Sequence, residues 1–289
     1  MKAKFYNNKL TLIVVSYHSG HIIENLINSF EKNIKILIIE NSLDYNLKLK
    51  LEKNYKNVEV IIPQKNLGNG GGINLGLKLS KTDFSLYLDA DITPDNEMIN
   101  ILLEHTNKIK NFAILAPKEK DYIYSESQYI HHDTKNNFHK MKFITGCALL
   151  FNMKTLPKTG NFDENIFLYY EEHDFFYRCL QNKLDIYLID KAKFFHQGTS
   201  STNNIYNNEI YLNRNWHYCW SKFYYFKKNY GYFYGIKKTL PNFLRAIRKY
   251  FFFKFKGDKK NSSLHKAELQ GLITSYLLKK STKRPNINL

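Results

Sequence analysis

The sequence predicts an α/β fold with a mainly parallel sheet flanked by helices, followed by a basic, aromatic-rich helical region. Short β-branched runs alternate with helical apolar patterns along the first two thirds of the chain. Residues 1–200 carry a net charge of +2, whereas residues 201–289 carry +15 and 20 of the 45 aromatic residues. Because composition changes so sharply there, we predict an α/β domain at residues 1–202 and a helical region at residues 203–289.

Length and composition exclude several protein classes. The 289 residues are 43% hydrophobic, which is enough for a sizeable core. Mean hydropathy is −0.47, and no apolar run reaches the roughly 18 residues of a membrane-spanning helix. The apolar run at residues 10–15 is too short for the core of a signal peptide. Three widely spaced cysteines without a CxxC pair argue against a disulfide framework or a zinc finger. We therefore expect a cytoplasmic protein.

Six apolar runs, most of them β-branched, predict the strands of the sheet. They lie at residues 10–16, 35–40, 58–62, 84–88, 112–116 and 185–189. Helical apolar spacing predicts helices at residues 21–32, 72–81, 95–109 and 172–182. Ligands of such sheets bind at the carboxyl ends of the strands, so the residues that follow each strand form the candidate site.

Polar side chains follow three of these strands directly. Ser16 and Tyr17 follow the first strand, Glu40 ends the second, and Asp89 and Asp91 follow the fourth. Any one of them alone is typical of a turn or a helix cap. Because the strands share one sheet, we expect the three endings to converge on one crevice.

Asp89 and Asp91 are one residue apart, so in an extended segment both carboxylates point to the same side. Two such carboxylates repel each other unless a cation or donor groups lie between them, and oxygen ligands suit Mg²⁺ or Mn²⁺. The alternative is a loop whose aspartates cap the helix at residues 95–109. The Asp-x-Asp pair alone does not decide between these interpretations.

Two further segments carry candidate site residues. The glycine-rich run at residues 66–76 allows close approach of a ligand to the backbone, although a flexible loop is the alternative. Glu171, Glu172 and Asp174 suit the first turn of a helix, but clustered carboxylates among aromatic rings also suit a general base. His196 follows the last predicted strand as either a structural residue or a ligand.

These motifs, in this order, resemble the GT-A inverting glycosyltransferases of family 2, in particular their bacterial rhamnosyltransferase-like branch. The resemblance covers residues 11–202. It rests on the opening Val-Val-Ser-Tyr, on Asn-Leu-Gly at residues 66–68 with Asn74-x-Gly76, on Asp89-x-Asp91, and on the stretch from Gly160 through Glu172 to His196. Each motif is weak alone, whereas their order and spacing together are specific.

The resemblance implies a role for each matching residue. The general base would be Glu172, with Glu171 and Asp174 as alternates. A divalent metal, Mg²⁺ or Mn²⁺, would be held by Asp91 and His196. The residues that would bind the nucleotide sugar are Ser16, Tyr17, Glu40, Asn66, Gly68, Asp89 and Gly146. The chain departs from the family pattern at Glu40 and Glu172, where most members have aspartate.

The resemblance also implies the reaction. A hexosyl or rhamnosyl group would pass with inversion from a dTDP- or UDP-linked donor to a hydroxyl of a glycan or lipid-linked saccharide, in bacterial surface polysaccharide biosynthesis. One alternative is a nucleotidyltransferase on a similar fold, but residues 16–20 lack the basic side chains of a triphosphate loop. The other alternative is a non-catalytic basic adaptor that binds membrane or nucleic acid; the acids at 89, 91 and 172 argue against it.

The basic region interleaves aromatic rings with lysine and arginine at residues 211–234 and 240–256. Phe243, Ile247, Phe251 and Phe255 recur every four residues, which is typical of an interfacial amphipathic helix. We expect a peripheral position on the anionic inner face of the cell membrane, with insertion of the rings of Phe243, Phe251, Phe252 and Phe253. The alternative is a helical subdomain that packs its rings inward. No recognition motif for nucleic acid accompanies the pattern, so we expect no nucleic-acid partner.

Overall fold

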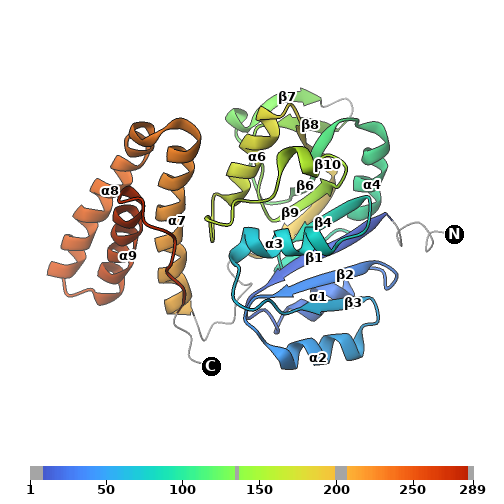
Figure 1. The fold of residues 1–289 in the computed structure, drawn as a ribbon, viewed down its shortest axis with the longest axis horizontal. Helices are drawn as coiled ribbons and strands as arrows, with labels where there is room; N and C mark the ends of the chain where they lie inside the picture. The colour runs from blue at the N-terminus through green and yellow to red at the C-terminus, as the bar shows by residue number, and fades with distance from the viewer. Residues whose placement is uncertain (1–8, 134–136, 199–206, 286–289) are drawn as a thin grey trace. The chain divides into compact units, whose positions relative to one another are not determined.

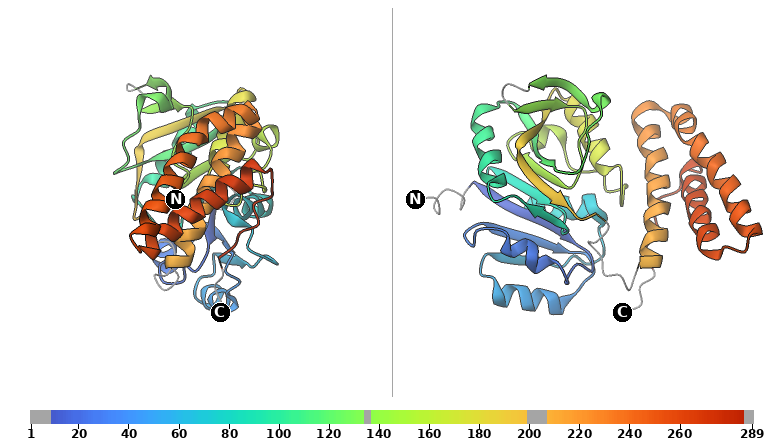
Figure 2. Two further views of the ribbon diagram at one scale, coloured as in Figure 1. Left: turned by 90° about the vertical axis from the view of Figure 1, so that its left-hand side faces the viewer. Right: turned by 180° about the vertical axis from the view of Figure 1, so that it is seen from behind.

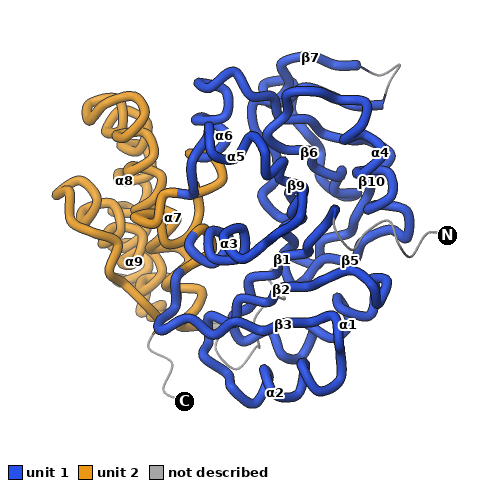
Figure 3. Tube along the Cα trace, turned by 45° about the vertical axis from the view of Figure 1, so that its right-hand side comes forward, with its two compact units in different colours: residues 1–67, 71–162, 175–203 blue, residues 68–70, 163–174, 204–289 orange. Residues whose placement is uncertain are grey.

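The computed structural model describes residues 9–133, 137–198 and 207–285 (Figure 1). The chain divides into two compact units (Figure 3). The first comprises residues 1–67, 71–162 and 175–203, and the second comprises residues 68–70, 163–174 and 204–289. Two short segments of the α/β part of the sequence therefore group with the C-terminal helices.

The first unit is built on one ten-stranded sheet in the order β3-β2-β1-β4-β9-β6-β10-β8-β7, with β5 paired to β10. The first four strands in this order are mutually parallel, β9 is antiparallel to both β4 and β6, and β10 is parallel to β6. The strands are β1 (Leu10–Ser16), β2 (Lys35–Glu40), β3 (Val58–Ile61), β4 (Phe84–Leu88), β5 (Ile92–Pro94), β6 (Phe112–Glu119), β7 (Tyr129–Asp133), β8 (Phe138–Met141), β9 (Ala148–Asn152) and β10 (Asp185–His196). The sheet confirms the predicted α/β class with a mainly parallel sheet, and the antiparallel pairing of β9 makes it mixed.

Helices cover both faces of this sheet. They are α1 (Ile23–Asn28), α2 (Tyr45–Asn54), α3 (Gly68–Leu79), α4 (Met98–Lys108), α5 (Leu156–Thr159) and α6 (Glu171–Gln181), with a 3-10 turn at Glu126–Gln128. Alternate residues of β1 enter two cores, because successive side chains of a strand point to opposite faces. Leu12 packs with α1, α2 and α4, whereas Ile13 packs with α3 and α6.

The glycine-rich run belongs to helix α3, which begins at Gly68 rather than at the predicted residue 72. A Cβ atom at Gly72 would press on Val15, and one at Gly76 would collide with the side chain of Ile13. Glycine at these positions lets the helix lie close against β1. The run therefore has a packing function, and the flexible-loop interpretation is wrong.

Several elements differ from the predicted ones. The last strand, β10, has twelve residues and continues to His196, beyond the predicted end at residue 189. Helix α2 and strands β5, β7, β8 and β9 were not predicted. The helices predicted at residues 21–32 and 95–109 are shorter at both ends.

The second unit contains three helices, α7 (Asn207–Tyr230), α8 (Tyr232–Phe255) and α9 (Lys259–Tyr276), which pack side by side (Figure 2). One small core groups Trp216 and Trp220 with Ala267, and another groups Phe223 with Leu272. Gly271 lies so close to the carbonyl of Trp216 that a Cβ atom there would collide with it. Within the described residues, no helix is both long and apolar enough to cross a membrane.

The ring pattern of α8 corrects part of the prediction for this region. Phe243 packs inward beside Tyr276, and Phe253 stacks on His265 with ring centroids 5.6 Å apart. Phe251 and Phe252 are exposed, as predicted. Five exposed apolar side chains lie along one side of the helix at intervals of four or seven residues, and we call them the α8 stripe: Phe233, Leu240, Leu244, Phe251 and Phe255.

Candidate active site

Asp89 and Cys147 are brought together by the pairing of β4 with β9. The two strands are antiparallel, with Leu88 opposite Ala148. The backbone N–H of Asp89 donates to the carbonyl oxygen of Cys147 at 2.8 Å. Asp89, which follows β4, therefore lies directly beside Cys147, which precedes β9.

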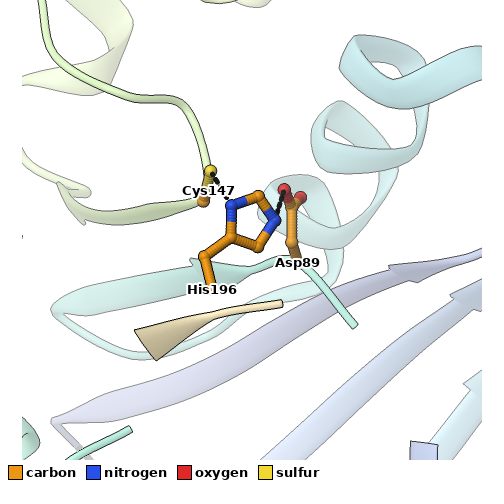
Figure 4. A group of neighbouring side chains, drawn as sticks. All are labelled: Asp89, Cys147 and His196. Carbon is orange, nitrogen blue, oxygen red and sulfur yellow. Dashed lines mark hydrogen bonds and ion pairs between the residues drawn. The ribbon is translucent and has the colours of Figure 1, made fainter. Parts of the chain in front are cut away.

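His196 reaches the same place from the end of β10, where it pairs with Ile92 of β5. Its Nε2 atom lies 3.3 Å from Oδ1 of Asp91 and 3.9 Å from Oδ2 of Asp89. Its Nδ1 atom lies 3.5 Å from Sγ of Cys147 (Figure 4). The same Nδ1 atom lies 3.4 Å from Oε1 of Glu119. Sequence reasoning missed two members of this group, Cys147 and Glu119.

The donor set fits a divalent cation. One ligand atom each from Asp89, Cys147 and His196 lie within 4.8 Å of one another. Asp91 is buried and contacts the same imidazole. Carboxylates are usual ligands of Mg²⁺ and Mn²⁺, and imidazole and thiol groups are usual ligands of transition metals such as Zn²⁺. The group of possible ligands contains Asp89 and His196, and Asp91, which the sequence analysis placed on the metal with His196, lies 3.3 Å from the same imidazole.

The charges of the group also favour a cation. Burial raises the pKa of Asp89 to about 6, against the lowering effect of its hydrogen bond from Tyr87. The hydrogen bond with Asp91, reinforced by the nearby carboxylates, raises the pKa of His196 to about 9. Burial and the negative charges of Asp89 and Glu119 raise the pKa of the Cys147 thiol far above its ordinary value. A bound cation would offset this crowding of negative charge.

Ser16 and Glu40 face each other across β1 and β2, where the register pairs them. The Ser16 hydroxyl donates to one carboxylate oxygen of Glu40, and the backbone N–H of Ser42 donates to the other at 2.8 Å. Glu40 is fully buried, and this burial raises its pKa in spite of these hydrogen bonds. Tyr17, which follows β1, is half-buried with its ring edge-on to His18.

The remaining predicted binding residues lie at other points of the chain. Asn66 and Gly146 are half-buried, and Gly146 adjoins Thr145, whose hydroxyl is hydrogen bonded to Tyr124. Gly68 has a φ of +75°, and a Cβ atom there would collide with the carbonyl of Phe167. Asn74 of the predicted Asn74-x-Gly76 motif exchanges two hydrogen bonds with the backbone of Phe162, which is a structural role.

The acidic cluster opens helix α6, and its three members differ in environment. Glu171 is buried and accepts a hydrogen bond from Asn69 at 2.9 Å. Asp174 is fully buried and forms an ion pair with Lys228 at 2.9 Å. The Glu172 side chain stays 21% exposed, with its Oε1 3.1 Å from Nδ1 of His173. Burial acts to raise the pKa of Glu172, but the hydrogen bond and charge of His173 outweigh it, so this pKa lies below its ordinary value.

The backbone just before this cluster is strained. Tyr169 and Tyr170 have φ angles of 64° and 68°, a left-handed conformation that is unfavourable for bulky residues. The ring of Tyr170 lies 5.6 Å from those of Tyr218 and Tyr225, and the hydroxyl of Ser221 donates to the carbonyl of Leu168 at 2.8 Å. Contacts from α7 thus hold the strained segment.

Lys228 of α7 joins the two ends of the segment at residues 163–174. Its ammonium group lies 2.8 Å from Asp163 and 2.9 Å from Asp174. The hydroxyl of Tyr224 donates to Asp163, and the amide of Asn229 donates to Asp174. The only sequence signal for these partners was the basic, aromatic character of the region, which does not indicate what it contacts.

The mixed sheet with helices on both faces, and the acids and histidine at its strand ends, are those expected of a GT-A sugar transferase. A family model described as glycosyl transferase family 2 matches residues 11–181. The chain therefore belongs to glycosyltransferase family 2.

Two relatives carry glycosyltransferase names. The low-salt glycan biosynthesis hexosyltransferase Agl10 of Haloferax volcanii is 22% identical over 197 residues, which span 61% of this chain and 63% of that protein. The uncharacterized glycosyltransferase R363 of Acanthamoeba polyphaga mimivirus is 27% identical over 176 residues, which span 56% of this chain and 66% of that protein. The matches thus cover less than two thirds of the length of either relative.

Solved structures share the fold. TarS of S. aureus, residues 1–349, superposes with a TM-score of 0.55 at 17% identity, covering 91% of this chain and 92% of that one. GalNAc-T7, solved with UDP, GalNAc and Mn²⁺, gives a TM-score of 0.55 at 13% identity. The match covers 81% of this chain and 57% of that one. A structure of TarS with UDP-GlcNAc gives a TM-score of 0.53 at 16% identity. The match covers 91% of this chain and 92% of that one.

Proposed function

We propose that this family 2 glycosyltransferase is a metal-dependent, inverting enzyme. It moves a hexosyl group from a nucleoside diphosphate donor to a hydroxyl of a glycan or lipid-linked saccharide in surface polysaccharide biosynthesis. The observation that carries the proposal is the convergence of Asp89, Asp91 and His196 at the ends of β4 and β10. This is the edge of the sheet at which an α/β fold binds its ligand.

The cation would be Mg²⁺ or Mn²⁺, held by Asp91 and His196 with Asp89 beside them. When bound, such a cation supplies positive charge to the diphosphate as it leaves. Support comes from the donor set and from the excess of carboxylate around His196.

The donor would be a dTDP- or UDP-linked sugar. Ser16, Tyr17 and Glu40 would bind the base and ribose, and Asn66, Gly68 and Gly146 would border the diphosphate and sugar. Support comes from the positions of Ser16 at the end of β1, Glu40 at the end of β2 and Asp89 just after β4, since these three strands are adjacent and parallel. Structural neighbours in the family fold were solved with UDP or UDP-GlcNAc.

The general base would be Glu172. Its side chain is 21% exposed, so an acceptor hydroxyl can reach its carboxylate. Glu171 and Asp174 are buried in contacts with Asn69 and Lys228, which makes them poorer proton acceptors. Glu172 would remove the proton of the acceptor hydroxyl as its oxygen bonds to the anomeric carbon. The bond from that carbon to the diphosphate oxygen breaks on the opposite face, which inverts the anomeric centre.

The C-terminal region would place the enzyme on the anionic inner face of a membrane, where lipid-linked acceptors lie. Support comes from the net charge of +15 over residues 201–289 and from the exposed α8 stripe. Basic side chains near such a surface each contribute about 1 kcal/mol at low salt.

The test is a screen of nucleotide sugars for nucleoside diphosphate release, with and without divalent cations. Release should require Mg²⁺ or Mn²⁺ and stop in EDTA. Asp91→Asn should remove most activity, whereas Asp95→Asn, at an exposed residue paired with Lys120, should leave it unchanged. Full turnover in EDTA would show that the metal assignment is wrong.

A further inference from the structure

The chain contains three cysteines, and one of them differs from the other two. Cys179 and Cys219 are buried among apolar side chains of the two units. Cys147 is half-buried at the edge of the first unit's hydrophobic core, and its sulfur also lies beside the Asp89 carboxylate and the His196 imidazole of the candidate active site. A thiol that merely fills space is normally surrounded by apolar groups.

We propose that Cys147 is a sulfur ligand of the cation at Asp89 and His196. The active-site metal then has a mixed oxygen, sulfur and nitrogen ligand set. This inference rests on the proposed function, since it assumes that the enzyme binds a divalent cation there.

Strand pairing places the sulfur where a ligand must be. The hydrogen bond from Asp89 N–H to Cys147 O ties the two residues together, and Sγ lies 3.5 Å from Nδ1 of His196. Ligand atoms about 2.0–2.3 Å from one tetrahedral metal ion are separated by about 3.5 Å from each other. The three candidate atoms already lie within 4.8 Å of one another, so small side-chain rotations would close the site around an ion.

Asp89, Asp91, His196 and Cys147 would together supply at most four protein ligands. A cation that accepts more than four ligands, such as Mg²⁺ or Mn²⁺, would keep a position open for a diphosphate oxygen of the donor. A sulfur ligand favours borderline and soft cations such as Zn²⁺, Co²⁺ and Cd²⁺ over Mg²⁺. Of the two cations proposed above, Cys147 would therefore favour Mn²⁺ over Mg²⁺.

The first experiment is optical titration of the purified protein with Co²⁺ in the presence of UDP. A thiolate bound to Co²⁺ should give an intense near-ultraviolet charge-transfer band. Cys147→Ser should lose this band and bind Co²⁺ at least tenfold more weakly, while Cys219→Ser should keep both. A band that persists in Cys147→Ser, or that is missing from the unmodified protein with Co²⁺ bound, would overturn the inference.

The second experiment needs no variant. Iodoacetamide should alkylate Cys147 first, because the other two thiols are buried. Saturating Zn²⁺ or Co²⁺ should slow this alkylation at least tenfold, as read by peptide mass spectrometry, and Mg²⁺ should slow it much less. An equal rate with and without Zn²⁺ would show that the sulfur does not ligate.

The two proposals fail in different ways. If Mn²⁺ and UDP bind but neither the band nor the protection is seen, Cys147 is not a ligand and the metal-dependent function stands. If the unmodified protein binds no divalent cation with UDP, metal dependence and the role of Cys147 are both wrong, whereas membership of the family is unaffected.

Discussion

Glu172 is the residue on which the proposed chemistry depends most directly. Glu172→Gln keeps the shape of the side chain and removes its ability to accept a proton. We expect turnover to fall by about 10²-fold or more, the usual scale of general-base catalysis, with donor affinity nearly unchanged. Steady-state kinetics at saturating donor and a separate titration of donor binding would measure the two quantities.

The neighbouring acids provide matched controls for that substitution. Glu171→Gln and Asp174→Asn change buried carboxylates that are engaged by Asn69 and Lys228, so they should act mainly through stability. An active Glu172→Gln enzyme together with a folded but inactive Glu171→Gln enzyme would transfer the role to Glu171.

Single residues show how far the sequence could predict the site. The pairing of Asp91 with His196 could be anticipated, because both follow strands of the same sheet. Cys147 and Glu119 could not, since their place beside His196 depends on β9 and on the full length of β6 and β10. A cysteine next to a glycine carries no sequence signal for what lies across the sheet.

At the scale of elements, Lys228 links helix α7 to both ends of the segment that leads into α6. Lys228→Met would leave the fully buried Asp174 without its cation. Loss of a buried pair costs about 3–5 kcal/mol. Because Lys228 is partly exposed, we expect about 2 kcal/mol of lost unfolding free energy. Turnover should fall as well, with donor affinity retained. Denaturant titration and kinetics would measure both effects.

The adjacent lysine offers the control. Lys227 lies over the ring of Tyr224, so Lys227→Met removes a similar charge without freeing a buried carboxylate. Lys228→Arg should restore most of the stability and turnover. If Lys227→Met and Lys228→Met lost equal stability and turnover, the charge of the helix would matter rather than the ion pairs of Lys228 with Asp163 and Asp174.

A second element-scale prediction concerns acid stability of the helical unit. His217 of α7 is buried, with its ring nitrogens hydrogen bonded to Ser281 and to the carbonyl of Lys283. Burial lowers its pKa to about 4, from about 6.5 in the unfolded chain. The unfolded chain therefore binds the extra proton first, so stability should fall as pH drops from about 6.5 to 4. At about 1.4 kcal/mol per pKa unit, the loss is up to roughly 3 kcal/mol.

Tryptophan fluorescence would follow this loss selectively, because both tryptophans of the chain, Trp216 and Trp220, belong to α7. In the His217→Gln variant, the free energy of unfolding should change much less between pH 6.5 and pH 4. An unchanged slope would show that other groups cause the acid sensitivity.

Some helices and strands can be predicted from the apolar pattern of their own sequence, whereas others form only because they pair with neighbouring strands. Buried strands such as β1 and β4 could be predicted, because continuous apolar runs fit a strand covered on both faces. Strands β7 and β8 could not, since their short, polar and histidine-rich sequences acquire strand geometry only from their neighbours. The inward turn of Phe243 and Phe253 depends on α9, which the ring pattern did not reveal.

At the scale of the whole molecule, the net charge of +15 over residues 201–289 predicts binding to anionic lipid surfaces. The stripe residues Phe233 and Phe255 are 86% and 88% exposed, among basic side chains of the same helix. We expect flotation with anionic phosphatidylglycerol vesicles and little with neutral phosphatidylcholine vesicles. Added salt should weaken binding, because part of it is Coulomb attraction that ions screen.

The triple change Leu244→Ser, Phe251→Ser and Phe255→Ser tests the α8 stripe directly, and should reduce flotation severalfold. Leu49→Ser with Ile123→Ser removes exposed apolar side chains elsewhere and should have no effect. Equal binding to both lipids, or undiminished binding of the triple variant, would favour the inward-packing alternative for this region.

The segment at residues 163–174 limits which C-terminal regions can be exchanged between related proteins by recombination. It precedes the helical region in the sequence by many residues, yet Asp163 and Asp174 are joined by Lys228. The family match ends at residue 181, so it includes the segment and none of the helices that hold it. A recombination event near residue 200 would separate Glu172, the proposed general base, from the helices that hold its segment. Tails exchanged between relatives should therefore succeed only when residues 163, 174 and 228 come from the same parent.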